Sequence, residues 1–323
     1  MTAGGRHRLR SLLLVACLLL VTAASAGLGV IWNLDRTIND NVRRLDGLFP
    51  AESTRPPAAE LAPGTGATPV TVLFIGATTL PRASAASRFP ADTVMVARIS
   101  ADRDRVDVVS LPADSMVPIP GFGVDRISAA TTRGGVPLAV QTVEDLLETR
   151  IDHVVLADLD GVAEITDAVG GVEVTVTDPF SAGGRTYAAG THTLDGAAAL
   201  AFVREQASLP GRDLDRATHQ QEYLSGLAAR LTGSQLLAEP NRLIALLAVA
   251  ADNVVVDADL SPRMLRSLAF SMRGLRADDV HLSTAAVAEV RVQGAGPLAV
   301  DLSEPGLEQL RTALAEDDFA AAY

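Results

Sequence analysis

The stretch Val70-Thr-Val-Leu-Phe-Ile75, closed by Gly76, decides the fold class of this chain. This run of apolar and β-branched residues is typical of a strand buried on both faces of a sheet. Two more strands are predicted at Thr93–Ile99 and Val106–Leu111, on either side of the charged turn Ala101–Asp104. Their short separation predicts an antiparallel hairpin beside the first strand.

Helical patterns alternate with strands in the remainder of the chain. The predicted helices are Val136–Leu147, about Asp160–Ala168, Asp195–Arg204, about Leu214–Leu231 and Pro262–Arg273, and the predicted later strands are Ile151–Leu156, Val172–Val176 and Val254–Val256. Such alternation predicts an α/β (mixed α+β) fold, a three-layer α-β-α domain with a central mixed sheet. We place this domain at residues 70–321.

The N-terminal region predicts a membrane anchor. Residues 1–10 carry Arg6, Arg8 and Arg10, and residues 11–32 are apolar and long enough to cross a bilayer. Basic residues stay in the cytoplasm, so the main domain is expected outside a single-pass cell-membrane anchor. The alternative is a signal peptide cleaved near Ala24–Ala26. The anchor is preferred because apolar residues continue through Trp32.

A connecting region is predicted between this anchor and the domain. Residues 33–49 have loosely helical apolar spacing and predict a juxtamembrane helix. Residues 50–69 are rich in Pro, Ala, Gly and Thr and predict a linker.

The charge of the chain argues against a nucleic-acid-binding protein, and its cysteine content argues against disulfides and cysteine metal sites. The net charge is −12, and all 27 basic residues are arginine. An acidic chain without a basic arm argues against nucleic-acid binding, and therefore against a transcriptional regulator. The single cysteine, Cys17, lies in the apolar N-terminal run, so the exported domain has no disulfide and no cysteine metal site.

The densest group of charged residues is Arg204 to Gln221, which reads R-E-Q-A-S-L-P-G-R-D-L-D-R-A-T-H-Q-Q. Arginines beside carboxylates around a Pro-Gly turn favour a bound oxyanion, most often phosphate. The helix that starts near Leu214 adds oriented N–H donors. The alternative is a solvated network of salt bridges between two helices. His219, at the end of this stretch, is expected to be an exposed helical residue.

Together these stretches resemble the LytR-CpsA-Psr family of membrane-anchored cell-wall proteins, closely over about Val70–Leu231. The residues that carry the resemblance are Val72–Gly76, Asp92–Met95, Ser110–Pro112, Arg126-Ile127, Gly134-Gly135, Thr142–Leu146, Ile151–Val154, Asp167–Val172, Leu194–Gly196, Ala201–Arg204, Asp213–Arg216 and Gln220-Gln221.

The resemblance implies a phosphotransferase that moves a glycopolymer from a polyprenyl-pyrophosphate lipid to peptidoglycan, usually with Mg²⁺. It also implies an apolar tunnel for the lipid under the sheet, with arginines holding the pyrophosphate at its mouth. By the same resemblance Asp92 matches a catalytic and metal-binding position and Arg204 a catalytic, pyrophosphate-binding one. The other implied pyrophosphate-binding residues are Arg126, Asp213, Arg216 and Gln220.

Several charged positions of the family pattern are substituted in this chain. Thr78 stands where the family has a second aspartate, Pro90 and Ala113 stand for arginines, Gln206 stands for the second arginine of an Arg-x-Arg pair, and Ser128 stands for an asparagine. Loss of one transition-state donor costs about 10²-fold or more in rate. Two hypotheses follow: an active or weakened transferase, or a catalytically silent relative that binds lipid-linked intermediates or supports an active paralogue.

Overall fold

The computed structural model describes residues 42–59, 67–81, 84–206, 208–211, 213–232, 246, 248–292 and 298–319. Its strands are β1 Arg43–Leu45, β2 Val70–Ala77, β3 Thr93–Ile99, β4 Val106–Leu111, β5 Met116–Ile119, β6 Gly123–Arg126, β7 His153–Asp158, β8 Val172–Val176, β9 Phe180–Ala182, β10 Arg185–Tyr187, β11 Gly190–Leu194, β12 Val254–Asp257, β13 Val280–Thr284, β14 Val287–Val292 and β15 Leu298–Leu302. Its helices are α2 Ala129–Leu147, α3 Gly161–Val169, α4 Gly196–Arg204, α5 Asp213–Thr232, α8 Pro262–Ser271 and α9 Glu304–Glu316.

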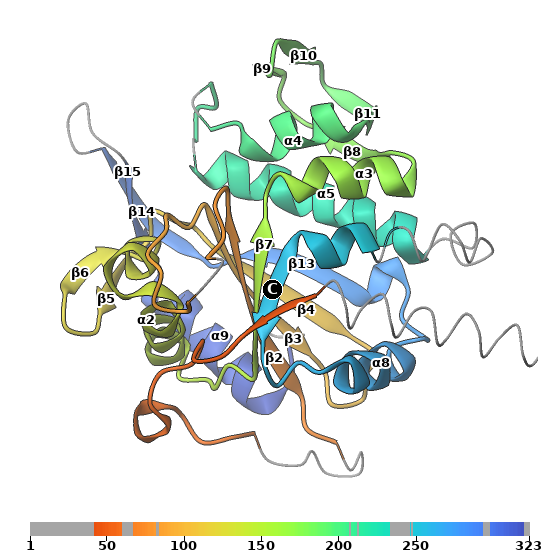
Figure 1. Cartoon of the computed structure of the whole chain (residues 1–323). Coiled ribbons are helices and arrows are strands. Elements are labelled where there is room, and N and C mark those ends of the chain that lie inside the picture. Colours follow the sequence, from red (N-terminus) through yellow and green to blue (C-terminus); the bar gives the residue numbers. More distant parts are fainter. Residues whose placement is uncertain are drawn as a thin grey trace, which may run out of the picture.

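A seven-stranded mixed sheet forms the centre of the domain (Figure 1), in the order β1-β12-β7-β2-β3-β4-β13. As predicted, β3 and β4 form an antiparallel hairpin, and β2 lies inside the sheet between β3 and β7. Because β2 is covered on both faces, its sequence is apolar without alternation. The predicted mixed sheet is therefore confirmed.

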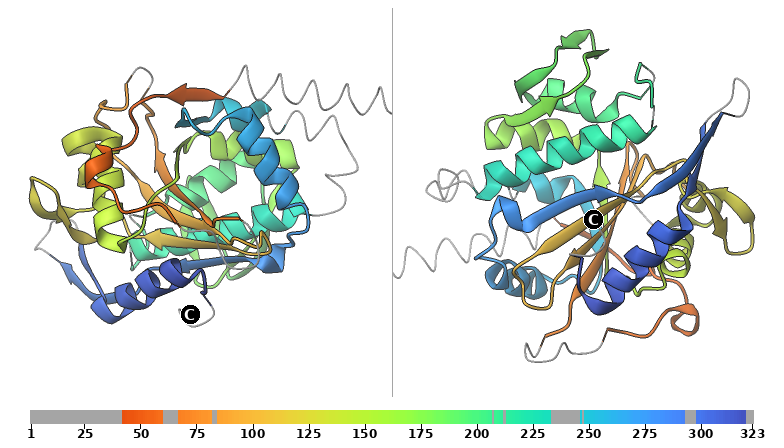
Figure 2. Two further views of the ribbon diagram at one scale, coloured as in Figure 1. Left: turned by 90° about the horizontal axis from the view of Figure 1, so that it is seen from below. Right: turned by 180° about the vertical axis from the view of Figure 1, so that it is seen from behind.

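Helices cover both faces of the sheet (Figure 2). One face, which includes Leu73 and Ile75 of β2, packs against α2 and α9 in the largest hydrophobic cluster. The opposite face, which includes Val70 and Val72, packs against α8. Successive strand residues point to opposite faces, so one apolar strand supplies both layers.

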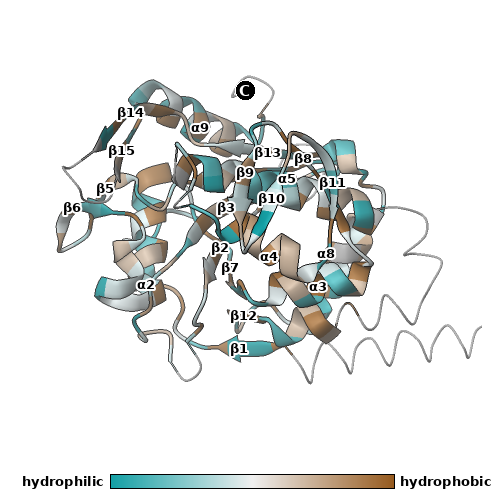
Figure 3. Cartoon of the chain, turned by 90° about the horizontal axis from the view of Figure 1, so that it is seen from above, coloured by the Kyte–Doolittle hydropathy of each residue, from teal (hydrophilic) through white to brown (hydrophobic). Residues whose placement is uncertain are grey.

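A smaller unit stands at one end of the sheet, made of α3, α4, α5 and strands β8–β11 (Figure 1). It has its own apolar cluster around Phe202, which is fully buried. As predicted, Asp195 caps α4, accepting a hydrogen bond from the Ala198 amide at 2.8 Å. In Figure 3, α3 shows both hydrophobic and hydrophilic residues, and β1 at the sheet edge combines two arginines with Leu45.

The segment predicted as juxtamembrane helix and linker is partly incorporated into the domain. Residues 43–45 are not helical but form β1, which pairs in parallel with β12 at the sheet edge. Leu48 is 1% exposed and belongs to the main core. The folded domain therefore begins before Val70, and the predicted boundary at that residue was wrong. Residues 33–41 and 60–66 lie outside the described residues.

Helix α2 begins earlier than predicted and contains a break. The sequence predicted a helix from Val136, but α2 runs from Ala129 and has Gly135 at φ +71° inside it. A Cβ at Gly135 would lie 2.6 Å from the carbonyl oxygen of Ala85, so glycine is required there. The segment after this break is the predicted helix.

The predicted anchor at residues 11–32 lies outside the described residues. Within the part of the chain that the structure describes, no helix combines the length and apolar character needed to cross a bilayer.

Asp257 of β12 accepts a hydrogen bond from β7 and makes the stability of the domain depend on pH. Its carboxylate accepts from the Val154 and Leu260 amides, each at 2.9 Å, and lies 3.2 Å from Nδ1 of His153. Burial alone raises the pKa of Asp257, but the hydrogen bonds from His153, Val154 and Leu260 outweigh it, so the pKa is lowered.

Asp257→Asn is expected to lower the free energy of unfolding by about 1–3 kcal/mol at neutral pH, because bonds to a charged acceptor are lost. Because the pKa of Asp257 is lower in the folded state than its unfolded value of 3.8, ionised Asp257 stabilises the folded protein at pH values above 3.8. This contribution is lost as the pH falls through the folded-state pKa. Urea unfolding of wild type and variant at a series of pH values measures this. The difference should shrink on acidification, and a constant difference would contradict the assignment.

Candidate functional site

An apolar cavity of about 340 Å³ lies between the central sheet and α5. Its walls come from β2, β3, β4, β7 and β13 on one side and from α3, α4 and α5 on the other. The lining includes Phe74, Met95, Val108, Leu224, Leu227 and Leu231. The cavity lies on the sheet face opposite the main core, at the junction with the smaller unit. Such a cavity suits an aliphatic chain.

Two polar side chains, Thr93 and Gln220, line this cavity together with the apolar ones. Thr93 Oγ1 donates to Gln220 Oε1 at 3.0 Å, which joins the start of β3 to α5. Gln220 Nε2 donates in turn to the carbonyl oxygen of Val203 at 3.2 Å. The predicted site residue Gln220 is thus buried and fixed by two partners, which ties α4, α5 and the sheet together at one end of the cavity.

Asp92 immediately precedes Thr93 and is held against the end of β2. Its amide donates to the Gly76 carbonyl oxygen at 2.8 Å. Its Oδ2 accepts from both the amide and the hydroxyl of Thr78, each at 3.2 Å. The two positions that the resemblance assigns to a pair of carboxylates therefore lie together, but one of them carries a neutral hydroxyl.

Arg216 connects α5 to the same place. Its Nη2 donates to the backbone oxygen of Asp92 at 2.7 Å, and its Nη1 donates to Gln206 Oε1 at 3.4 Å. Arg216 therefore contacts the Asp92 region directly. The substituted position Gln206 contacts this arginine directly.

Arg204 ends α4 and lies beside the loop after β7. Its Nη2 is 2.9 Å from Asp160 Oδ1, an ion-pair distance without hydrogen-bond geometry. Its Nε is also buried and has no hydrogen-bond partner among the described residues. Because a buried N–H of a cation without an acceptor is costly, this guanidinium is suited to receive an oxyanion.

Arg126 lies in a separate depression of about 430 Å³, lined also by Pro90, Ala91 and Ser128. Its Nη1 is 3.4 Å from Asp114 Oδ1. The chain from Pro90 to Asp92 links this depression to the Asp92 region. The structure thus brings together Asp92, Arg216 and Gln220, with no described contact between Arg126 and these residues.

The arginine-rich stretch also includes Arg212, Asp213 and His219. Asp213 is the first residue of α5, but its side chain is not described, and Arg212 lies outside the described residues. His219 is not an exposed helical residue, because its ring stacks on Phe180 and Phe202 at 4.5 and 4.4 Å. Burial lowers the pKa of His219, although the nearby Asp215 opposes this shift.

Sequence reasoning missed Thr93 and Asp160 as parts of this site. Thr93 is adjacent to a predicted ligand, and a hydroxyl at the start of a strand was an available signal. Asp160 gave no such signal, because it reaches Arg204 only through the packing of α3 on α4.

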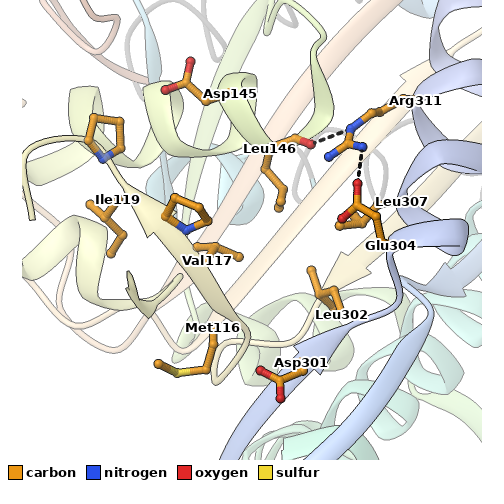
Figure 4. Close-up of a pocket in the computed structure, with 12 residues that line it drawn as sticks. Met116, Val117, Ile119, Asp145, Leu146, Asp301, Leu302, Glu304, Leu307 and Arg311 are labelled. Atoms are coloured by element: carbon orange, nitrogen blue, oxygen red, sulfur yellow. Dashed lines mark hydrogen bonds and ion pairs between the residues drawn. The ribbon is translucent and has the colours of Figure 1, made fainter. Parts of the chain in front are cut away.

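A second groove lies away from these residues, between α2, β5, β15 and α9 (Figure 4). It measures about 530 Å³, and its apolar walls include Val117, Leu302 and Leu307. Arg311 at its rim donates to Glu304 at 2.7 Å and to the Leu146 carbonyl oxygen at 3.1 Å. None of the residues predicted as site residues lines this groove.

A family profile and several curated proteins match this chain. The sequence profile of the LytR_cpsA_psr family matches residues 50–316. A probable cell wall biosynthesis protein LcpB of Corynebacterium glutamicum is 37% identical over 185 residues, which cover 57% of this chain and 44% of that protein. A polyisoprenyl-teichoic acid--peptidoglycan teichoic acid transferase TagU of Enterococcus faecalis is 32% identical over 51% of this chain and 54% of that protein. The match thus spans about half the length of each curated relative.

Solved structures match the fold. TagV of Bacillus subtilis superposes with a TM-score of 0.64 at 22% identity, covering 77% of this chain and 98% of that one. A structure of TagT bound to LI-WTA superposes with a TM-score of 0.61 at 23% identity, covering 83% and 98%. At this level of identity the likeness establishes the shared mixed α/β fold.

Proposed function

Because the chain belongs to the LytR_cpsA_psr family, we propose that it binds a polyprenyl-pyrophosphate-linked glycopolymer and transfers the glycopolymer to peptidoglycan. The TagU relatives, whose name states a transfer of teichoic acid to peptidoglycan, support a role of this type. We also propose that residues 11–32 anchor the chain and hold the domain outside the cell membrane, next to its lipid-linked donor.

The observation that carries this proposal is the apolar cavity, whose lining includes Thr93, Val203 and Gln220, with Asp92 and Arg204 next to the first two in the chain. The polyprenyl chain would occupy the cavity between the sheet and α5, where its burial is driven by the hydrophobic effect. The pyrophosphate would lie toward Arg204 and Arg216. Guanidinium groups bind phosphate oxygens through two parallel N–H donors, which fixes orientation as well as charge.

The transfer itself is a substitution at phosphorus. A peptidoglycan hydroxyl oxygen forms a bond to the phosphorus that carries the glycopolymer, and the bond from that phosphorus to the bridging oxygen breaks. Polyprenyl phosphate leaves with the electron pair, and the hydroxyl proton passes to water. Arg204 and Arg216 would stabilise the charge that develops on the phosphoryl oxygens, and Gln220 would fix α5 against the strand that carries Asp92.

The proposal includes Mg²⁺, for which these residues offer few ligands. Asp92 is the carboxylate that would hold it, and the residues fit only in part because Thr78 supplies a neutral oxygen. Mg²⁺ is commonly bound through one or two carboxylates plus substrate phosphates and water, so a single aspartate is compatible with a shared ion. When bound, Mg²⁺ would neutralise charge on the pyrophosphate.

A second candidate is a catalytically silent protein that binds the lipid-linked intermediate or supports an active paralogue. The observation that favours it is the contact between Gln206 and Arg216, where a neutral amide stands in place of a second guanidinium. Thr78, which stands in place of a second aspartate, also favours the catalytically silent protein. Both candidates share the cavity and the pyrophosphate site and differ only in turnover.

One experiment separates the two candidates. The purified protein is incubated with a polyprenyl-pyrophosphate-linked substrate, a peptidoglycan acceptor and Mg²⁺, and the release of lipid phosphate is followed. Turnover supports the transferase. Binding of the lipid without turnover supports the silent relative, and absence of binding contradicts both.

Leu227→Trp, which places a larger side chain in the cavity wall, is expected to weaken binding of a long polyprenyl pyrophosphate by about tenfold or more. Exclusion of about 60 Å² of apolar ligand surface already costs about 1.5 kcal/mol at 25 cal/mol per Å². Binding of inorganic pyrophosphate should not change, because the polar groups remain in place. Calorimetric titration with both ligands measures this, and equal weakening of both would contradict the assigned role of the cavity.

A further inference from the structure

The hairpin of β5 and β6 carries apolar side chains that the protein does not bury. Phe122 lies in the turn between the two strands and is 49% exposed, and Val124 of β6 is 65% exposed. They are two of the four large hydrophobic side chains that are exposed in the described part of the chain. The guanidinium carbon of Arg133 lies 5.6 Å from the centre of the Phe122 ring. The ring is therefore held at the surface with about half of its area open to a ligand.

The depression around Arg126 lies beside this ring, because Arg133 is also part of its lining, together with Asp125. Asp125 Oδ2 accepts from Arg133 Nη2 at 2.6 Å, and its Oδ1 accepts from the Arg126 amide at 2.8 Å. The hydrogen bond from Arg133 lowers the pKa of Asp125, so this carboxyl group is ionised at neutral pH. Arg126 pairs with Asp114 in the same depression. Each guanidinium thus has a carboxylate partner, and the two pairs carry no excess charge.

A neutral ligand that is rich in hydroxyl groups fits this chemistry. A paired carboxylate and guanidinium offer acceptors and donors side by side. Thr132, which also lines the depression, donates its hydroxyl to the Ala129 carbonyl oxygen at 2.9 Å and keeps its own lone pairs as acceptors. The face of an aromatic ring is negative and attracts the C–H bonds that cover one face of a pyranose ring. An open aromatic ring beside such polar pairs therefore favours a sugar.

The depression also lies where the second substrate of the proposed transfer must approach. Pro90 and Ala91 line the depression, and Thr93 lines the apolar cavity. Three residues of extended chain span about 11 Å at most, so the two sites are neighbours. Figure 3 shows β5 and β6 on one side of the domain and α3, which borders the cavity, on the other. The attacking and leaving oxygens of a phosphoryl transfer lie roughly in line. With the leaving polyprenyl phosphate in the cavity, the attacking hydroxyl comes from the side of the depression.

We propose that the depression beside Phe122 binds a neutral N-acetylhexosamine ring of the acceptor glycan strand, with the Phe122 ring against one face of the sugar. Asp125 and Arg133 would bind the hydroxyl groups of this sugar. The inference rests on the proposed function and gives the peptidoglycan acceptor a binding site on this chain. The occupant is not a membrane lipid, because the hairpin lies away from the cavity that would hold the polyprenyl chain.

Binding of a soluble glycan to the whole protein tests this without any need for turnover. The tetramer of N-acetylglucosamine serves as the neutral glycan and is titrated calorimetrically. Phe122→Ala is expected to weaken its binding by about eightfold, since a sugar that covers about 50 Å² of ring surface gains about that factor in affinity. Phe122→Tyr keeps the ring and should bind like wild type. Phe122→Leu keeps an apolar side chain without a flat ring and should bind as weakly as Phe122→Ala. Unchanged melting temperatures verify that these surface variants are folded.

Phe270→Ala is the matched control for Phe122→Ala. Phe270 of α8 is 69% exposed, and the guanidinium carbon of Arg273 lies 4.3 Å from the centre of its ring. It has the same kind of cationic neighbour but does not line the depression, so Phe270→Ala should bind the tetramer like wild type. Two donor analogues complete the series: geranyl pyrophosphate and geranyl pyrophosphate linked to one N-acetylglucosamine. Both should bind equally to wild type and Phe122→Ala, because Phe122 does not line the cavity.

The outcomes separate the acceptor site from the proposed function. Equal binding of the tetramer by wild type and Phe122→Ala, or by wild type and Phe122→Leu, would overturn the sugar site. Weaker binding of the sugar-linked donor analogue by Phe122→Ala would assign the depression to the donor and overturn the acceptor site. Loss of binding to phosphatidylglycerol vesicles in place of the tetramer would make the hairpin a membrane contact, with the same consequence. The proposed function stands in all these cases if geranyl pyrophosphate binds. If wild type binds the tetramer but not geranyl pyrophosphate, the proposed function fails, and the role of the sugar as acceptor fails with it.

Discussion

Glu144→Ala is expected to lower the free energy of unfolding by about 3–5 kcal/mol, the cost of leaving a buried charge without its partner. Glu144 is fully buried in α2, and its Oε1 accepts from Nη2 and Nε of Arg55 at 2.8 and 3.0 Å. The same oxygen accepts from the Ile151 amide at 2.9 Å. Arg55 also donates to the Ile151 carbonyl oxygen and lies over the Phe49 ring.

Chemical denaturation of wild type and variant measures this loss. Arg150→Ala is the control, because its partner Glu52 is exposed, and a much smaller change is expected there. The double variant Arg55→Met/Glu144→Leu should recover part of the stability, since it removes the unpaired guanidinium but leaves the Ile151 amide and carbonyl oxygen without these partners. A loss below 1 kcal/mol in Glu144→Ala would contradict the structural role of this pair.

Arg204→Ala is expected to lower the rate of lipid phosphate release by about 10²–10³-fold, the usual cost of removing one donor to transition-state charge. Its Nε is buried without a hydrogen-bond partner among the described residues, so a bound phosphate oxygen would be its acceptor. If the protein binds without turnover, the same variant should weaken geranyl pyrophosphate binding by about 10–100-fold, because a charge-assisted bond of about 1.5–3 kcal/mol is lost.

Arg185→Ala is a matched control for this variant. Arg185 lies in β10 and forms an exposed pair with Asp195, away from the cavity. Its removal should leave both rate and affinity unchanged. Equal effects of the two substitutions, or an Arg204→Ala protein that binds and turns over like wild type, would exclude Arg204 from the site.

The sequence predicted those elements whose information is local. The β3–β4 hairpin follows from two β-branched runs around one charged turn, and the end of α3 follows from Gly170, which adopts φ +80° at the helix terminus. Strand β1 could not be predicted in this way. Its three residues pair with Val255–Asp257, more than 200 positions later, and their own pattern does not identify a strand.

The same limit applies to the candidate site. The arginine-rich stretch gave Arg204, Arg216 and Gln220 as candidates, because charged and amide residues around a turn are visible in the sequence. The partners of these residues were not visible. Asp160 meets Arg204 only because α3 packs on α4. Thr93 meets Gln220 only because α5 packs across the sheet.

The position of β1 also determines how the domain responds to tension. Any pull on the polypeptide ahead of residue 42 reaches the three-residue pairing of β1 with β12 first, before it reaches the rest of the structure. Once β1 detaches, the force acts next on the buried Leu48 and then on the ion pair between Arg55 and Glu144. We therefore expect force applied ahead of residue 42 to detach β1 before it separates Arg55 from Glu144.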